Sequence, residues 1–293
     1  MYISRTTKGY RIFRICNVFI MIIAIIVTLF PVLNVVAKSF SSAAYINANK
    51  ITFYPKGFNV NSYQYIMKDM NFWIDYKNTI VYTLVGTFIS LVMTSGFAYA
   101  LSVPRLKGKS FFMKFIVFTM FFGGGMIPNY LLIKGLGMYN TMWAIVVPGA
   151  ISTFLLILMK TFFESLPREL EEAASIDGMD TYGILLHIVL PLSTPILATI
   201  TLFYAVGAWN NWFGPFLYLD QTELQPVTLY LRNIIQGALS PEAAQEAACE
   251  AANDITANIK CVTIVLTALP ILCVYPFLQK YFVQGMMIGS IKA

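Results

Sequence analysis

Long apolar runs dominate the pattern of hydrophobic and polar positions along the chain. A helix of roughly 20 apolar residues crosses the hydrocarbon core of a bilayer, which is about 30 Å thick. Six runs reach about this length, at approximately residues 15–37, 78–103, 111–133, 142–163, 184–208 and 259–279. The pattern therefore predicts an all-α polytopic membrane protein with six transmembrane helices, formed as one transmembrane domain over residues 1–293.

Acidic residues avoid all six runs. None of the 14 Asp and Glu residues lies inside a run, and the stretch between Asp75 and Glu164 contains none. A charge at the centre of a membrane helix costs on the order of 3 kcal/mol even on the lenient insertion scale. This distribution supports the six spans. It also argues against a secondary transporter, because proton or sodium coupling usually leaves ionisable residues inside the membrane.

Composition and charge predict how the chain is oriented in the membrane. The chain is 58% hydrophobic and 12% charged, whereas soluble domains carry about 25% charged residues. With a cytoplasmic N-terminus, twelve of the 20 Lys and Arg residues fall on the cytoplasmic side, including the cluster from Arg105 to Lys114. Both chain ends are therefore predicted to be cytoplasmic, in a multi-pass protein of the cytoplasmic (inner) membrane. The net charge of +6 fits basic flanks and needs no nucleic acid.

Several segments between and within the spans are informative. Glycines and a proline at 123–128 are expected to break the third span at its outer end. An Ala- and Glu-rich stretch at 242–252 predicts a short surface helix. The aromatic first outer loop, 38–77, suits either an interfacial belt or a docking surface. A bridge between Cys249 and Cys261 is conceivable on the outer side, although their spacing does not demand one.

The inner segment 163–190 differs from every other part of the chain. It contains six of the 14 acidic residues and one strong base. Ser165 is a suitable N-cap, Pro167 fits a first turn and Gly178 is a stop signal, which together predict a helix of roughly 12 residues. Thr181 is expected to cap the next helix, which leads into the fifth span.

Small apolar side chains and carboxylates recur at helical spacing in this segment. A face of small side chains lets another protein approach closely, and flanking carboxylates offer partners for Lys or Arg. An ordinary solvated loop helix is the alternative. The residues predicted to make the contact are Glu169, Glu172, Ala173, Ala174, Ile176, Asp177 and Gly178.

A spaced motif in the same segment resembles a known family. Glu172-Ala173-Ala174, then Gly178, then Ile188 and Leu190-Pro191, is similar to the EAA motif of ABC importer permeases. Further residues resemble the carbohydrate branch of that family, which includes the second permease of maltose-type importers. They are Asn78-Thr79, the break at 123–128, Leu166-Pro167, Ile176-Asp177-Gly178, Trp209-Asn210 and the tail 279–285.

The resemblance implies a type I importer permease that carries a sugar or oligosaccharide delivered by an extracellular binding protein. It further implies a second permease chain, as a heterodimer, and two ATPase subunits, which the cytoplasmic coupling loop 163–190 contacts through its coupling helix. The sequence contains no Walker motif, so ATP and Mg are expected on the partner ATPase, with no cofactor and no catalysis on this chain. A peptide, amino acid or anion as cargo stays open, because importers share the motif. A purely structural membrane protein would not need it.

The end of the fifth span carries the candidate cargo path. Aromatic planes and amide groups can bind the CH faces and hydroxyls of sugars, but they equally suit an interfacial belt and helix capping. The residues concerned are Tyr204, Trp209, Asn210, Asn211 and Trp212. His187 is the only histidine, and no metal site is predicted around it.

Overall fold

The computed structural model describes residues 8–237 and 258–274. Every regular element in these ranges is helical, with one isolated β-bridge between Ser41 and Phe58, so the all-α prediction is confirmed. The chain divides into two compact units: Met1–Asp69 with Asn233–Ala268, and Met70–Arg232 with Leu269–Ala293. The predicted helix at 242–252, Cys249 and the tail 279–285 lie outside the described residues.

The first unit is built on one long helix. Helix α1 (Lys8–Ser39) is followed by α2 (Ala43–Asn47) and α3 (Asn61–Lys68), and a further helix begins at Asn258. The side-chain amide of Asn34 donates to the carbonyls of Ile51 and Thr52, at 3.1 and 2.9 Å. Asn258 donates to the Ser41 carbonyl at 3.1 Å, so side-chain hydrogen bonds from two helices hold the loop after α1.

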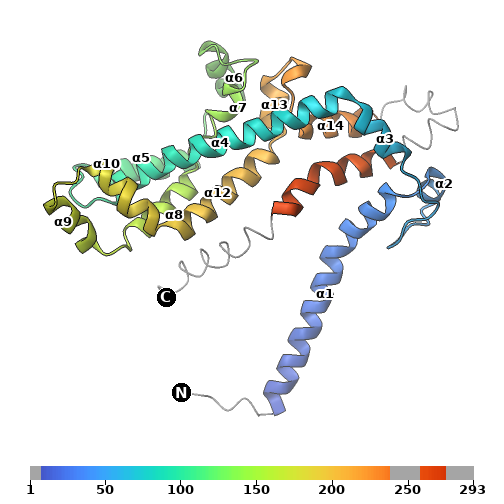
Figure 1. Ribbon diagram of the computed structural model, residues 1–293, viewed down its shortest axis with the longest axis horizontal. Helices are drawn as coiled ribbons and strands as arrows, with labels where there is room; N and C mark the ends of the chain where they lie inside the picture. Colours follow the sequence, from blue (N-terminus) through green and yellow to red (C-terminus); the bar gives the residue numbers. More distant parts are fainter. Residues whose placement is uncertain (1–7, 238–257, 275–293) are drawn as a thin grey trace. The chain divides into compact units, whose positions relative to one another are not determined.

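The second unit is built around α4 (Met70–Ser102), which packs along α8 and α12 (Figure 1). Its other helices are α5 (Lys109–Phe121), α6 (Met126–Gly135), α7 (Trp143–Val146), α8 (Thr153–Phe163), α9 (Arg168–Ile176), α10 (Thr181–Ile184), the π-helical turn η1 (Leu185–Val189), α11 (Leu190–Leu192), α12 (Thr194–Trp209), α13 (Phe213–Tyr218) and the 3₁₀ turn η2 (Thr222–Leu224). Helix α14 (Val227–Gly237) belongs to this unit up to Arg232. Apolar side chains from α4, α8 and α12 form its core, which also reaches α9. The most deeply buried members are Ala98, Met159, Val189 and Ile200.

The predicted spans correspond to helices, but several are not continuous. Among the described residues, α1 and α4 are each long and apolar enough to cross a membrane alone. The run 111–133 is split into α5 and α6, and the chain bends by 113° between them. Gly125 at this break has φ +87°, a conformation that glycine adopts without a steric penalty. The predicted break is therefore confirmed, and it makes a sharp corner.

Two other predicted runs are also interrupted. In 142–163, the one-turn α7 is separated from α8 by an irregular stretch containing Pro148 and Gly149. In 184–208, the chain bends by 86° next to Ser193, between the preceding helical segment and α12. Pro195 lacks an N–H and stands at the start of α12, where a helix begins readily but does not continue smoothly. Apolarity over 20 residues measures compatibility with lipid, and it is insensitive to such breaks.

Candidate functional site

Helix α9 forms in the acidic segment 163–190, as expected from the sequence, but it is shorter than predicted. It begins after Pro167 and contains nine residues. Ser165 is not its N-cap, because the Ser165 hydroxyl donates instead to the carbonyl of Phe162 at 2.6 Å, at the end of α8. Glu169 and Glu171 lie in the first turn, where carboxylates interact favourably with the positive end of the helix dipole.

The predicted end of α9 at Gly178 is confirmed. Gly178 has φ +81°, and its N–H donates to the carbonyl of Ser175 at 3.2 Å. The N–H of Met179 donates to the carbonyl of Ala174 at 3.0 Å, which completes a Schellman motif. The next helix is capped one residue earlier than predicted. The Asp180 carboxylate, and not Thr181, accepts the N–H of Gly183 at 3.1 Å.

The predicted contact residues divide between two faces of α9. Ala174 is buried and packs onto the core of the second unit. Beside it, the Tyr99 hydroxyl of α4 donates to the Glu171 carboxylate at 3.3 Å. The other predicted residues are exposed: Glu169, Glu172, Ala173, Ile176, Asp177 and Gly178. Ile176 exposes 86% of its surface, and it lies in an acidic segment that is unsuited to lipid.

The rest of the EAA-like motif has a packing role. Ile188 in η1 and Leu190 in α11 pack against the core of the second unit, while Pro191 is exposed. These residues connect α9 to α12 and shape the corner between them. The Nδ1–H of His187 donates to the carbonyl of Gly183 at 3.0 Å. Within the described ranges, no group of three or more His, Cys, Asp or Glu side chains could hold a metal ion.

A three-residue charge cluster fixes the chain just before α9. The Glu164 carboxylate pairs with Lys109 at 2.8 Å and with Lys160 at 2.7 Å. Lys109 also donates to the carbonyl of Ser102, at 3.2 Å, so the cluster joins the ends of α4, α5 and α8. Partial burial raises the pKa of Glu164, but the hydrogen bonds and charges of the two ammonium groups outweigh it and hold this pKa below its ordinary value.

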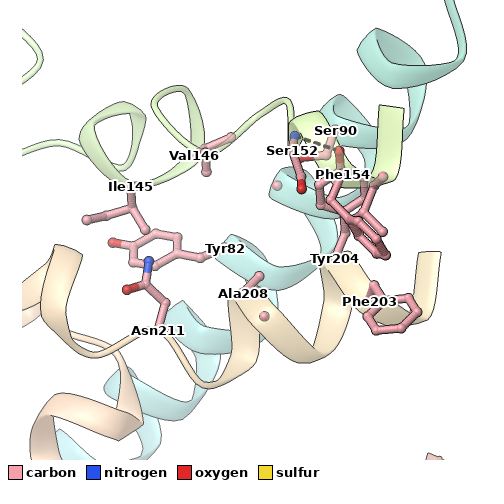
Figure 2. A pocket seen from close by; sticks show the side chains of 14 residues that line it. Tyr82, Ser90, Ile145, Val146, Ser152, Phe154, Phe203, Tyr204, Ala208 and Asn211 are labelled. Atoms are coloured by element: carbon pink, nitrogen blue, oxygen red, sulfur yellow. Dashed lines mark hydrogen bonds between the residues drawn. The ribbon is translucent and has the colours of Figure 1, made fainter. Parts of the chain in front are cut away.

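A second feature of the same unit is a cavity of about 400 Å³ between α4, the α7–α8 break and α12 (Figure 2). Aromatic rings and a few polar groups line it, among them Tyr82, Phe154, Phe203, Tyr204, Ser90, Ser152 and Asn211. The irregular backbone after α7 forms one wall. Within a membrane, non-helical backbone is tolerated only where protein covers it or where it lines an aqueous cavity. The break in the predicted fourth span is therefore part of the cavity.

Tyr204 holds this wall in place. Its hydroxyl accepts the N–H of Ser152 at 3.0 Å, which Figure 2 shows, and it shares a hydrogen bond of 2.7 Å with Thr94. Asn211 closes another side of the cavity, with its side chain directed toward the Tyr82 ring (Figure 2). Its amide oxygen accepts the N–H of Gly214 at 3.2 Å, so the side chain is held in this orientation.

Only two of the five predicted path residues line the cavity, namely Tyr204 and Asn211. Trp209 is buried against Tyr76, with ring centroids 5.9 Å apart. The Asn210 side chain donates to the carbonyl of Val206 at 2.9 Å, as expected for helix capping. Trp212 lies beside Phe213 and Phe216 on α13. Sequence reasoning missed Tyr82, Ser90 and Phe154, and the signal that could have indicated them was Pro148-Gly149 inside an apolar run.

Comparison with known proteins defines the class. The family described as "Binding-protein-dependent transport system inner membrane component" matches residues 1–288. The chain belongs to this family, and it is therefore a non-catalytic membrane subunit of an ABC importer.

Individual relatives cover almost the whole chain. Protein LplC of Bacillus subtilis is 40% identical over 100% of this chain and 99% of its own length. The B. subtilis polygalacturonan/rhamnogalacturonan transport system permease protein YtcP is 38% identical over 94% of this chain and 96% of its own. In a crystal structure of a bacterial ABC transporter that imports the acidic polysaccharide alginate, one chain is 35% identical, with a TM-score of 0.87. That match covers 94% of this chain and 98% of the other.

Proposed function

We propose that this subunit forms part of the membrane path for a sugar or oligosaccharide that an extracellular binding protein delivers. The observation that carries the proposal is the cavity beside the α7–α8 break, where aromatic rings and polar groups converge. Such a lining offers flat apolar faces to sugar CH groups and hydrogen-bond partners to hydroxyls. Two of the proteins named above support a carbohydrate cargo, since YtcP is described as a polygalacturonan/rhamnogalacturonan permease and the solved transporter imports alginate.

The proposal assigns α9 to the contact with a separate ATPase. Its exposed face combines Ile176 with the carboxylates of Glu169 and Glu172, so it offers one apolar contact and two partners for basic groups. In this arrangement two ATPase subunits bind ATP and Mg. A second permease chain, forming a heterodimer with this one, completes the path. Both termini then lie on the cytoplasmic side of the membrane with α9.

The cargo path is tested by comparing two adjacent asparagines. Asn211→Asp keeps the oxygen that accepts the N–H of Gly214 but removes the amide donor at the cavity. Asn210→Asp is the matched control, because it introduces the same charge outside the cavity lining and loses only an exposed hydrogen bond to the carbonyl of Val206. We expect Asn211→Asp to lower oligosaccharide uptake several-fold in cells that express the whole importer, at unchanged complex assembly, while Asn210→Asp stays close to wild type.

The outcome tests the cavity as the path and the carbohydrate as the cargo separately. Equal uptake by both variants and wild type would reject the cavity as the path. Uptake of peptides or amino acids, with no oligosaccharide carried, would reject the carbohydrate cargo and keep the importer class.

A further inference from the structure

An unusual bracket of one cation and two rings, Arg232 with Phe216 and Trp212, lies on the α13–α14 corner. The sequence pattern assigned a role to Trp212 but none to Arg232 or Phe216. The guanidinium carbon of Arg232 lies 3.8 Å from the ring centroid of Phe216 and 5.4 Å from that of Trp212. Phe216 lies in α13, Trp212 is the residue just before this helix, and Arg232 comes from α14. In the part of the chain that the structure describes, both ion pairs involve Glu164, so no described carboxylate pairs with Arg232.

The contacts within the bracket leave the N–H donors of the Arg232 guanidinium group available for a ligand. Cation–π contacts use the flat face of the guanidinium group, whereas its N–H donors point outward in the plane. That planar fork matches a carboxylate, to which it can donate two parallel hydrogen bonds. The Trp212 ring is 44% exposed and offers a flat apolar surface next to the cation. Together they fit a carboxylate that is attached to a sugar ring.

The bracket adjoins the proposed cargo cavity. The Thr228 hydroxyl, one helical turn before Arg232 in α14, donates to the carbonyl of Asn211 at 3.0 Å. Asn211 lines the cavity, and Trp212 is the next residue. Four residues of α-helix span about 6 Å, so Arg232 lies within about one sugar residue of the Asn211–Thr228 contact.

We propose that Arg232, held by Phe216 and Trp212, binds the carboxylates of an acidic oligosaccharide next to the cavity, so that the cargo class is a uronate-containing oligosaccharide. This inference rests on the proposed function, because it concerns the same path. A carboxylate on the docking surface of the binding protein has the same chemistry, but contiguity with the cavity favours the cargo. The experiment separates the two.

The test compares acidic and neutral probes in cells that express the complete importer. Oligogalacturonate and an alginate oligosaccharide are each paired with their carboxyl-reduced, neutral forms. Arg232→Met removes the charge and the fork, and Arg232→Lys keeps the charge but loses the fork. Lys134→Met is the control, because it removes an exposed cation of α6 that lies outside the cavity lining. Co-purification of the other subunits reports assembly.

We expect Arg232→Met to lower the ratio of acidic to neutral uptake by about tenfold, with neutral uptake unchanged. Arg232→Lys should fall between Arg232→Met and wild type, and Lys134→Met should match wild type. An equal loss of acidic and neutral uptake in Arg232→Met would indicate docking of the binding protein and overturn the inference, as would no change. If the wild-type importer takes up the neutral probes but not the acidic ones, the inference is overturned and the proposed function is retained. Uptake of no oligosaccharide overturns both.

Discussion

Replacing Ile176 by alanine tests whether α9 is a docking helix. The side chain is 86% exposed, the largest exposed fraction among the large apolar side chains of the described residues. Ile→Ala removes three carbon atoms, each worth about 0.8 kcal/mol when buried. If an ATPase cleft covers the exposed part, the loss is about 2 kcal/mol, which weakens binding by about 30-fold.

The measurement is the affinity of the purified ATPase for the membrane subunits in nanodiscs, with ATP turnover as a second readout. Ile15→Ala is the control, because Ile15 of α1 is 69% exposed in a span that suits lipid. The control removes the same atoms and should leave ATPase binding unchanged. An Ile176→Ala variant that assembles normally and binds ATPase with wild-type affinity would refute the docking role of this face.

Three further predictions concern the supports of the two sites. Gly178→Ala should destabilise the end of α9 by about 1–2 kcal/mol through backbone strain at φ +81°, since an added Cβ meets no neighbouring atom. Gly178→Asn should cost less, because Asn adopts this conformation more readily, and ATPase co-purification should decrease in the same order. The pKa of Glu164 in the folded protein lies below its ordinary value, so the ionised carboxylate stabilises the folded state. This stabilisation is fully present above the pKa of Glu in the unfolded chain, about 4.3, and is lost as the pH falls through the pKa of the folded state. The difference in melting temperature between wild type and Glu164→Gln should therefore shrink on acidification, and a constant difference would contradict the ion-pair role. Tyr204→Phe leaves the N–H of Ser152 without its partner, so the solubilised complex should lose about 1–3 kcal/mol in thermal unfolding, which an unchanged melting curve would refute.

The sequence predicted what depends on local chemistry and on long apolar runs. Helices α1 and α4 were found because their apolar residues continue without interruption, and Gly178 was found because few other residues adopt positive φ without strain. Ser165 was misread because its hydroxyl can bond either to the next helix or to the previous one, and the turn after α8 decides between them.

The cavity depends on contacts that no local pattern contains. Tyr82 and Tyr204 are far apart in the chain and meet because α4 packs along α12. The roles of Asn210 and Asn211 could not be separated in sequence, because neighbouring amides at a helix end face different directions. Arg232 gained a candidate role only when α14 placed it over Phe216.

A single helix carries residues of both candidate sites, and this placement bears on how they would act together. Ser90 of α4 lines the cavity, and Tyr99 of the same helix contacts Glu171 of α9. They are separated by about 14 Å along the helix axis. Between and around them, small buried side chains recur every four residues, at Gly86, Ser90, Thr94, Ala98 and Ser102. Such a ridge lets neighbouring backbones approach closely, and a closely packed interior does not compress. A displacement of α9 by a bound ATPase would therefore move α4 against α8 and α12 instead of being absorbed, and it would reach the cavity through the helix that forms its wall.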